Sequence, residues 1–127
     1  MCSTFQQMTR TKRVLLVDDD TDILESLAVI LADSFEVVSA CNGAEALQAL
    51  ERQHFHAVVL DLSMPVMDGE TLIERMRVAG IVVPVVLASG ISNLRELGER
   101  LGVEYICKPY DMSVLLAKLV LLVGREI

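Results

Sequence analysis

Val14-Leu-Leu-Val-Asp-Asp-Asp20 is a run of four apolar residues that stops at three consecutive carboxylates. An apolar run without alternation predicts a β-strand that is buried on both faces, as the strands of parallel sheets are. Apolar residues at helical spacing follow it, and they predict a helix that takes Thr21 or Asp22 as its N-cap. A strand that leads at once into a helix is the repeating unit of α/β folds.

The same alternation continues along the rest of the chain. Further strands are predicted at 37–38, 57–60, 82–88 and 105–107, and further helices at 44–53, around 72–76, at 93–101 and at 112–123. Pro84 falls near the start of its strand, where a missing N–H is tolerated. The pair Asp68-Gly69 predicts a turn in which the glycine takes a positive φ.

Five apolar strands alternating with five helices predict a doubly wound, flavodoxin-like α/β fold. Helices should cover both faces of a five-stranded parallel sheet, whose commonest strand order is 2-1-3-4-5. Ligands of such sheets bind at the carboxyl ends of the strands, where the strand order reverses. The residues that end the predicted strands are therefore the candidate site.

Length and composition favour one folded domain. The chain has 127 residues, of which 53% are hydrophobic and 23% charged, so a self-sufficient core can form. We expect residues 1–12 to be a flexible N-terminal segment and residues 13–127 to be the domain. The formal net charge of −7 argues against direct binding of nucleic acid, which requires a basic surface.

The sequence also argues against a membrane-spanning protein and against a secreted one. The longest nearly apolar run, Val114–Val123, contains Lys118 and reaches only about half of the ~20 residues that span a bilayer. The three cysteines, Cys2, Cys41 and Cys107, are odd in number and widely spaced, which suits a reducing compartment. We therefore expect a cytoplasmic protein that binds no membrane.

Polar residues stand where the predicted strands end. The first strand ends at Asp18-Asp-Asp20, and later strands end at Asp61, Ser89 and Lys108. The first and third strands are neighbours in the predicted order, so their carboxylates should meet. Two carboxylates about 4 Å apart repel each other by about 4 kcal/mol at an effective dielectric constant of about 20.

Such a cluster must take up a proton or bind a cation. An all-oxygen donor set suits a hard ion, with Mg²⁺ as the first choice and Mn²⁺ as the second. Lys108 and Ser89, on adjacent strand ends, would hold phosphoryl oxygens, and Asp61 is the natural acceptor. The pattern therefore predicts Mg²⁺-dependent phosphoryl transfer to Asp61.

Other functions fit the same residues less well. Three acids at one strand end exceed what a helix N-cap needs, although Asp20 alone would serve as a cap. A calcium loop that starts at Asp18 would need glycine at its sixth position, where Ile23 stands. The motif of haloacid-dehalogenase-like phosphatases breaks at Asp22, and three carboxylates would repel the phosphate of a flavin.

Four motifs stand in order along about residues 13–125. They are Val14-Leu-Leu-Val-Asp-Asp-Asp20, Asp61-Leu-Ser-Met-Pro-Val-Met-Asp-Gly69, Pro84-Val-Val-Leu-Ala-Ser89 and Tyr105-Ile-Cys-Lys-Pro109. Each motif alone is only suggestive. Together, and each at the right element of the fold, they resemble the receiver domains of two-component response regulators.

The resemblance implies a function in two-component signal transduction. Asp61 would accept a phosphoryl group from a sensor histidine kinase or a histidine phosphotransfer protein. The chain would be a phosphoacceptor with slow autodephosphorylation rather than an enzyme. Asp19 would bind Mg²⁺ directly and Asp18 mainly through water, while Asp61 and the backbone carbonyl of Ser63 would complete the protein ligands.

The resemblance also implies a switch. Lys108 would pair with the acyl phosphate, and its bond to Pro109 would be cis. Ser89 would hydrogen-bond a phosphoryl oxygen and draw in the loop before helix 93–101, and Tyr105 would then turn inward. The new dianion would thereby shift the population of two pre-existing conformations.

The chain departs from the family pattern in one place. This place is the surface that the switch would change, which helix 93–101, strand 105–107 and helix 112–123 would form. Between Ser89 and Lys108 the chain is shorter than the family spacing, so helix 93–101 or its preceding loop should be trimmed. Helix 112–123 is apolar almost all round, and we expect a homodimer through this surface. The alternative function is a receiver-like interaction module that is never phosphorylated.

Overall fold

The computed structural model describes residues 12–62 and 67–124 of the chain. The segment expected to be flexible, residues 1–12, lies outside these ranges except for residue 12, and Ser63 lies outside them too. None of the helices within these ranges is both long enough and apolar enough to cross a membrane.

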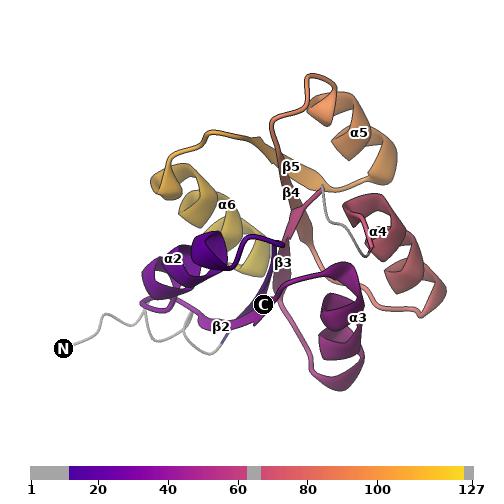
Figure 1. Ribbon diagram of the computed structural model, residues 1–127, viewed down its shortest axis with the longest axis horizontal. Helices are drawn as coiled ribbons and strands as arrows, with labels where there is room; N and C mark the ends of the chain where they lie inside the picture. The colour runs from indigo at the N-terminus through magenta and orange to yellow at the C-terminus, as the bar shows by residue number, and fades with distance from the viewer. Residues whose placement is uncertain (1–11, 63–66, 125–127) are drawn as a thin grey trace.

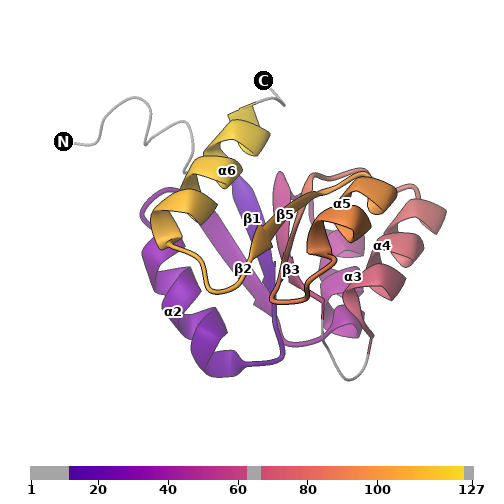
Figure 2. The same cartoon turned by 90° about the horizontal axis from the view of Figure 1, so that it is seen from above.

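One parallel sheet with the strand order β2-β1-β3-β4-β5 forms the centre of the fold. The strands are β1 (Arg13–Val17), β2 (Glu36–Ala40), β3 (Ala57–Asp61), β4 (Val85–Ser89) and β5 (Glu104–Cys107). The helices are α2 (Thr21–Leu31), α3 (Gly43–Arg52), α4 (Gly69–Val78), α5 (Leu94–Leu101) and α6 (Met112–Gly124). Helices α2 and α6 cover one face, and α3, α4 and α5 cover the other (Figures 1 and 2). The predicted doubly wound fold and strand order are confirmed.

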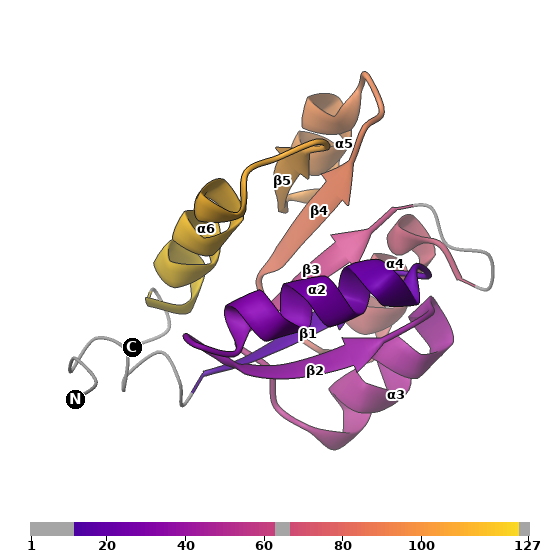
Figure 3. The same ribbon diagram turned by 60° about the vertical axis from the view of Figure 1, so that its left-hand side comes forward.

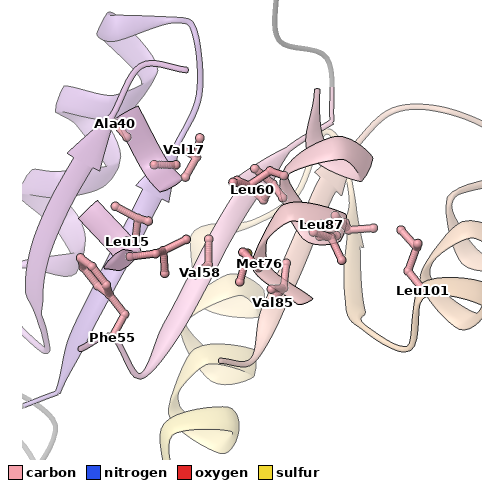
Figure 4. Close-up of a cluster of buried hydrophobic side chains, with 14 of the residues drawn as sticks. Leu15, Val17, Ala40, Phe55, Val58, Leu60, Met76, Val85, Leu87 and Leu101 are labelled. Carbon is pink, nitrogen blue, oxygen red and sulfur yellow. The ribbon is translucent and has the colours of Figure 1, made fainter. Parts of the chain in front are cut away.

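Strand β1 shows why an unbroken apolar run was needed. Val14 and Leu16 pack in the cluster beneath α2 and α6, whereas Leu15 and Val17 pack in the cluster beneath α3, α4 and α5. Successive side chains of a strand point to opposite faces, and both faces are covered here. All four side chains are at most 2% exposed, and each contributes about 1.5–3 kcal/mol on burial. Figure 4 shows Leu15 and Val17 together with Leu60 of β3 in the second cluster.

The carboxyl ends of the strands meet at one edge of the sheet. Every neighbouring pair of strands is parallel, and Figure 3 shows β2, β3 and β4 running in the same direction. The chain therefore leaves β1, β3, β4 and β5 at the same edge. This edge brings together the polar residues that end those strands.

The N-cap of α2 differs from the first prediction. Asp20, not Thr21 or Asp22, is the cap: it has extended backbone angles, and its side chain accepts hydrogen bonds from the N–H groups of Asp22 and Ile23. A cap must lie one residue before the first helical φ and ψ angles, and α2 begins at Thr21. The separate expectation that Asp20 is a cap is confirmed.

Strand β4 begins later than predicted, at Val85 rather than Val82. Val82 is 93% exposed, so the apolar run from residue 82 does not reflect burial along its whole length. The carbonyl of Pro84 accepts a hydrogen bond from the N–H of Val58, but proline has no N–H to donate in return. The ladder to β3 therefore starts at the next residue.

Gly69 does not take the positive φ predicted for it. Among the described residues, the glycines with positive φ are Gly80 and Gly102. Gly69 is instead the first residue of α4, directly after the N-cap Asp68. A Cβ atom at this position would lie 3.2 Å from Leu62 Cα and 3.3 Å from the carbonyl oxygen of Asp61, so the start of α4 packs closely against the end of β3.

A candidate phosphoacceptor and metal site at the sheet edge

The register of the sheet sets the centre of the site. Val17 of β1 is paired with Leu60 of β3, so the next residue of each strand, Asp18 and Asp61, lies at the same edge. Asp18 is held there by two backbone contacts. Its N–H donates to the carbonyl of Ala40, and its Oδ1 accepts from the N–H of Asp20 at 3.0 Å.

Three carboxylates meet at this edge. Asp18, Asp19 and Asp61 each offer an oxygen, and these three oxygens all lie within 4.8 Å of one another. Asp18 is buried, Asp61 is partly buried and Asp19 is exposed, so the group opens to solvent on one side. We call these three residues the acidic triad. The structure thus brings together the side-chain ligands that the sequence predicted.

Lys108 joins the acidic triad from the end of β5. Its Nζ lies 3.4 Å from Asp61 Oδ1 and 3.8 Å from Asp18 Oδ2. The N–H of Lys108 donates to the carbonyl of Ser89 at 2.9 Å, which continues the pairing of β4 with β5. The bond between Lys108 and Pro109 is cis, as expected. A hydrogen-bonded backbone therefore aims this ammonium at the carboxylates.

The electrostatics of the acidic triad favour a cation. Burial is the main cause that raises the pKa of the Asp18 carboxyl, and the charge of Asp61 raises it further. The hydrogen bond from the Asp20 N–H and the charge of Lys108 oppose this rise in pKa. Three carboxylates face a single ammonium, so negative charge is in excess at this edge. Because the carboxylates offer oxygen ligands, a hard divalent cation could bind them and neutralise this excess. An acidic triad of this kind is typical of a Mg²⁺ site.

Ser89 lies one strand away from Asp61. It is buried, and its Oγ accepts a hydrogen bond from the N–H of Ile91 at 3.2 Å. The register pairs Asp61 with Ala88, the residue just before Ser89. The hydroxyl therefore lies at the end of β4 and contacts the loop that leads to α5, next to the strand that carries Asp61.

Tyr105 and Tyr110 flank the site region differently. Tyr105 is partly buried in β5 and packs against the cluster beneath α5. Tyr110, which sequence reasoning missed, lines a small cavity of about 10 Å³ together with Asp18, Asp61 and Lys108. This volume is about the minimum that holds one water molecule. Burial raises the pKa of the Tyr110 hydroxyl, while the charge of Lys108 opposes the rise.

An aromatic residue directly after Lys108-Pro109 was the signal that could have identified Tyr110. Its place in the cavity that the carboxylates line depends on the turn after β5, which brings residue 110 to the same cavity as Lys108. Ser63, whose backbone carbonyl was expected to complete the metal ligands, lies outside the described residues.

Comparison with known proteins agrees with this geometry. The family model of the response regulator receiver domain matches residues 14–120. The transcriptional regulatory protein PrrA of Mycobacterium tuberculosis is 40% identical over 118 residues, which cover 90% of this chain and 51% of PrrA. The chain therefore spans about half the length of the curated relatives it matches.

Solved structures share the fold. The receiver domain of the Francisella response regulator 1452 superimposes with a TM-score of 0.86 at 27% identity, covering 92% of this chain and 100% of that chain. The response regulator TrrA of Thermotoga maritima was crystallised in complex with Mg²⁺ and BeF. It superimposes with a TM-score of 0.78 at 30% identity, covering 88% of this chain and 99% of TrrA.

Proposed function

This chain belongs to the response regulator receiver domain family, and from that premise we propose that Asp61 accepts a phosphoryl group from a phosphohistidine. The donor would be a sensor histidine kinase or a histidine phosphotransfer protein. The observation that carries the proposal is the convergence of the acidic triad and Lys108 at one edge of the sheet. We propose that residues 13–127 make up the phosphoacceptor domain.

In the proposed step, a carboxylate oxygen of Asp61 attacks the phosphorus atom and the phosphorus–nitrogen bond of the phosphohistidine breaks. The imidazole leaves with the electron pair of that bond and takes up a proton. Lys108 stabilises the negative charge of the transferring group, because its ammonium already lies 3.4 Å from Asp61. Mg²⁺, when bound, supplies further neutralisation of the phosphoryl oxygens. The protein ligands would be Asp18, Asp19 and Asp61 with the backbone carbonyl of Ser63, and Mn²⁺ would serve as a substitute.

Phosphorylation would then act on Ser89 and Tyr105. We propose that the hydroxyl of Ser89 donates to a phosphoryl oxygen and that the loop before α5 follows it. Two features support this role: Ser89 neighbours the strand of Asp61, and its hydroxyl already contacts that loop through Ile91. The resulting shift between two conformations would change the surface formed by α5, β5 and α6.

We propose that this surface mediates a homodimer when Asp61 is phosphorylated. Val114 and Leu121 of α6 are 45% and 64% exposed and lie seven residues apart, which places them on the same side of the helix. Lys118 of α6 lies 3.7 Å from Glu104 of β5, so both charges stand beside this apolar patch. A second copy related by a twofold axis would find complementary charges around a shared apolar centre.

We propose a cytoplasmic location, which the cysteine content and the family support. We also propose that the aspartyl phosphate hydrolyses slowly, without a dedicated catalytic base. The chain spans about half of its curated relatives, so output activities of whole regulators are separate from this phosphoacceptor function.

Intact-mass spectrometry tests the phosphoacceptor assignment. The chain is incubated with a small phosphodonor, such as acetyl phosphate or phosphoramidate, and Mg²⁺. We expect one phosphoryl group on the native chain and none on Asp61→Asn. Asp68→Asn is the matched control, because Asp68 caps α4 and is not part of the acidic triad, and it should be modified like the native chain.

The same experiment decides between the two candidate functions. A receiver-like interaction module that is never phosphorylated would take up no phosphoryl group with either a small phosphodonor or a phosphorylated histidine kinase. Equal modification of the native chain and Asp61→Asn would overturn the site assignment. The position of Lys108 beside Asp61 favours the phosphoacceptor function, because an interaction module has no need of this ion pair.

A further inference from the structure

Gly98 occupies the interior of α5, where glycine weakens a helix relative to alanine. Its backbone does not require glycine, because the positive φ angles among the described glycines are those of Gly80 and Gly102. The residue is buried. A packing contact must therefore account for the missing side chain.

That contact is with the ring of Tyr105. A Cβ atom on Gly98 would lie 2.6 Å from Tyr105 Cδ1 and 3.3 Å from its Cγ. It would also lie 3.2 Å from the carbonyl oxygen of Val103, whose N–H donates to the Gly98 carbonyl at 2.9 Å. This hydrogen bond prevents the helix from moving away freely. The ring of Tyr105 thus rests on the helix backbone, in a slot that a glycine leaves open.

Tyr105 and Ser89 share one face of the sheet. The register pairs Tyr105 with Leu87 and Ser89 with Cys107. Alternate residues of a strand point to the same face, and paired residues of parallel strands do so as well. The ring in the slot is therefore one pleat away from the Ser89 hydroxyl, whose partner Ile91 lies in the loop that leads into α5.

We propose that Gly98 is a positioning residue of the switch: in the unphosphorylated chain its slot holds the ring of Tyr105 against α5, and phosphorylation of Asp61 lets the ring turn inward, out of the slot and toward Ser89. This inference rests on the proposed function and names a residue that sets the balance between two ring positions. A side chain at position 98 disfavours the position in the slot. It therefore shifts the population toward the other position before any phosphoryl group is added.

Nuclear magnetic resonance of the tyrosine rings tests this inference on the full chain. The chain has two tyrosines, so selective labelling gives two sets of ring signals, which Tyr110→Phe assigns. A small phosphodonor with Mg²⁺ should shift the Tyr105 signals of the native chain. Gly98→Ala should shift them in the same direction without the phosphodonor, and the phosphodonor should then add a smaller shift.

Gly124→Ala is the matched control, because Gly124 is also helical and a Cβ atom there would meet nothing within 4 Å. It should leave the Tyr105 signals unchanged. Gly98→Ala signals that stay at their native positions, or move the opposite way, would overturn the inference. Mass spectrometry on the same samples separates two failures. Modification of Asp61 without a ring shift overturns this inference alone, whereas no modification overturns the proposed function and this inference with it.

A second variant covers the case in which Gly98→Ala does not fold. The clash involves the ring, so Tyr105→Ala should restore the folded chain when it is combined with Gly98→Ala, as circular dichroism would show. A double variant that stays unfolded would overturn the inference, because the obstructed group would then not be the ring.

Discussion

Lys108 and Asp61 stand 47 positions apart in the chain, yet Lys108 Nζ lies 3.4 Å from Asp61 Oδ1. The same ammonium lies 3.8 Å from Asp18 Oδ2, and three carboxylates share this edge of the sheet. The contact partly neutralises the acidic triad and leaves it with an excess of negative charge. This excess determines how substitutions and divalent cations should change the stability of the protein.

Lys108→Gln should destabilise the protein when no divalent cation is present. The free energy of unfolding should fall by about 1–2 kcal/mol, below the roughly 3–5 kcal/mol of a fully buried ion pair. The reason for the smaller loss is that 34% of the Lys108 side chain is exposed. Mg²⁺ should offset most of this loss, because it neutralises the same carboxylates. Urea unfolding at constant ionic strength, with and without Mg²⁺, measures both effects.

Lys118→Gln is the matched control for that prediction, since its side chain is also 34% exposed and its Nζ lies 3.7 Å from Glu104 Oε1. An ion pair of this kind contributes about 0–1 kcal/mol, and its loss should not depend on Mg²⁺. Equal losses in both variants, with no response to Mg²⁺, would contradict a special role of Lys108 in neutralising the acidic triad.

Mg²⁺ should stabilise the native chain because the proposed Mg²⁺ site, the acidic triad, is assembled in the folded chain and not in the unfolded one. At about 100 times its dissociation constant, the cation should add about 2.7 kcal/mol to the free energy of unfolding. Asp19→Asn should remove most of this gain. Thermal unfolding against Mg²⁺ concentration measures it, with Asp22→Asn, an acid in the first turn of α2, as the control. A stabilisation that Asp19→Asn leaves intact would show that Mg²⁺ binds elsewhere.

Asp18→Asn should stabilise the cation-free protein at neutral pH. Burial raises the pKa of Asp18 above its ordinary value of 3.8, so the unfolded chain loses this proton first as the pH rises. The folded state then binds more protons than the unfolded state, and the free energy of unfolding falls until the pH passes the raised pKa. The variant should gain about 0.5–2 kcal/mol at neutral pH, the usual range for one stabilising substitution. This gain should vanish below pH 3.8, and a gain that persists there would contradict the prediction.

The contribution of Asp68 to stability should depend on pH in the opposite way to that of Asp18: the ionised Asp68 carboxylate stabilises α4. The N–H of Thr71 donates to its carboxylate and holds the pKa of Asp68 below its ordinary value of 3.8. This contribution is therefore present above pH 3.8 and is lost as the pH falls through the lowered pKa. Asp68→Ala should cost about 1 kcal/mol at neutral pH, as removal of an N-cap usually does. Chemical unfolding at a series of pH values measures this difference, and Asp68→Asn, which keeps an accepting oxygen, should lose less than Asp68→Ala.

Leu121→Asp should prevent the proposed homodimer without unfolding the chain. Leu121 is 64% exposed, so a carboxylate there remains hydrated in the monomer but would be buried in the dimer. Light scattering on the phosphorylated chain should show a dimer for the native sequence and a monomer for the variant. Val82→Asp, at a residue that is 93% exposed and distant from α6 along the chain, should leave dimerisation unchanged. A native chain that stays monomeric at high concentration, with and without phosphorylation, would refute the dimer.

Sequence patterns predicted the architecture because a strand that is buried on both faces of a sheet must be apolar at every position. Val14 to Val17 had to be apolar without a break, and the chain had to become polar where β1 leaves the core. The same reasoning placed Asp61 and Lys108 at the ends of their strands. Parallel strands then brought these residues to one edge, which is why the acidic triad could be predicted before any distance was known.

Other features depended on contacts between segments that are distant in the sequence. The chain alone determined which residues end the strands and which charges they carry, since residue type and periodicity are local properties. Only the tertiary structure decided that Gly98 underlies the ring of Tyr105 and that Tyr110 lines the same cavity as Asp18. Each of these outcomes follows from how closely two remote parts of the backbone approach, and packing of the whole core sets that distance.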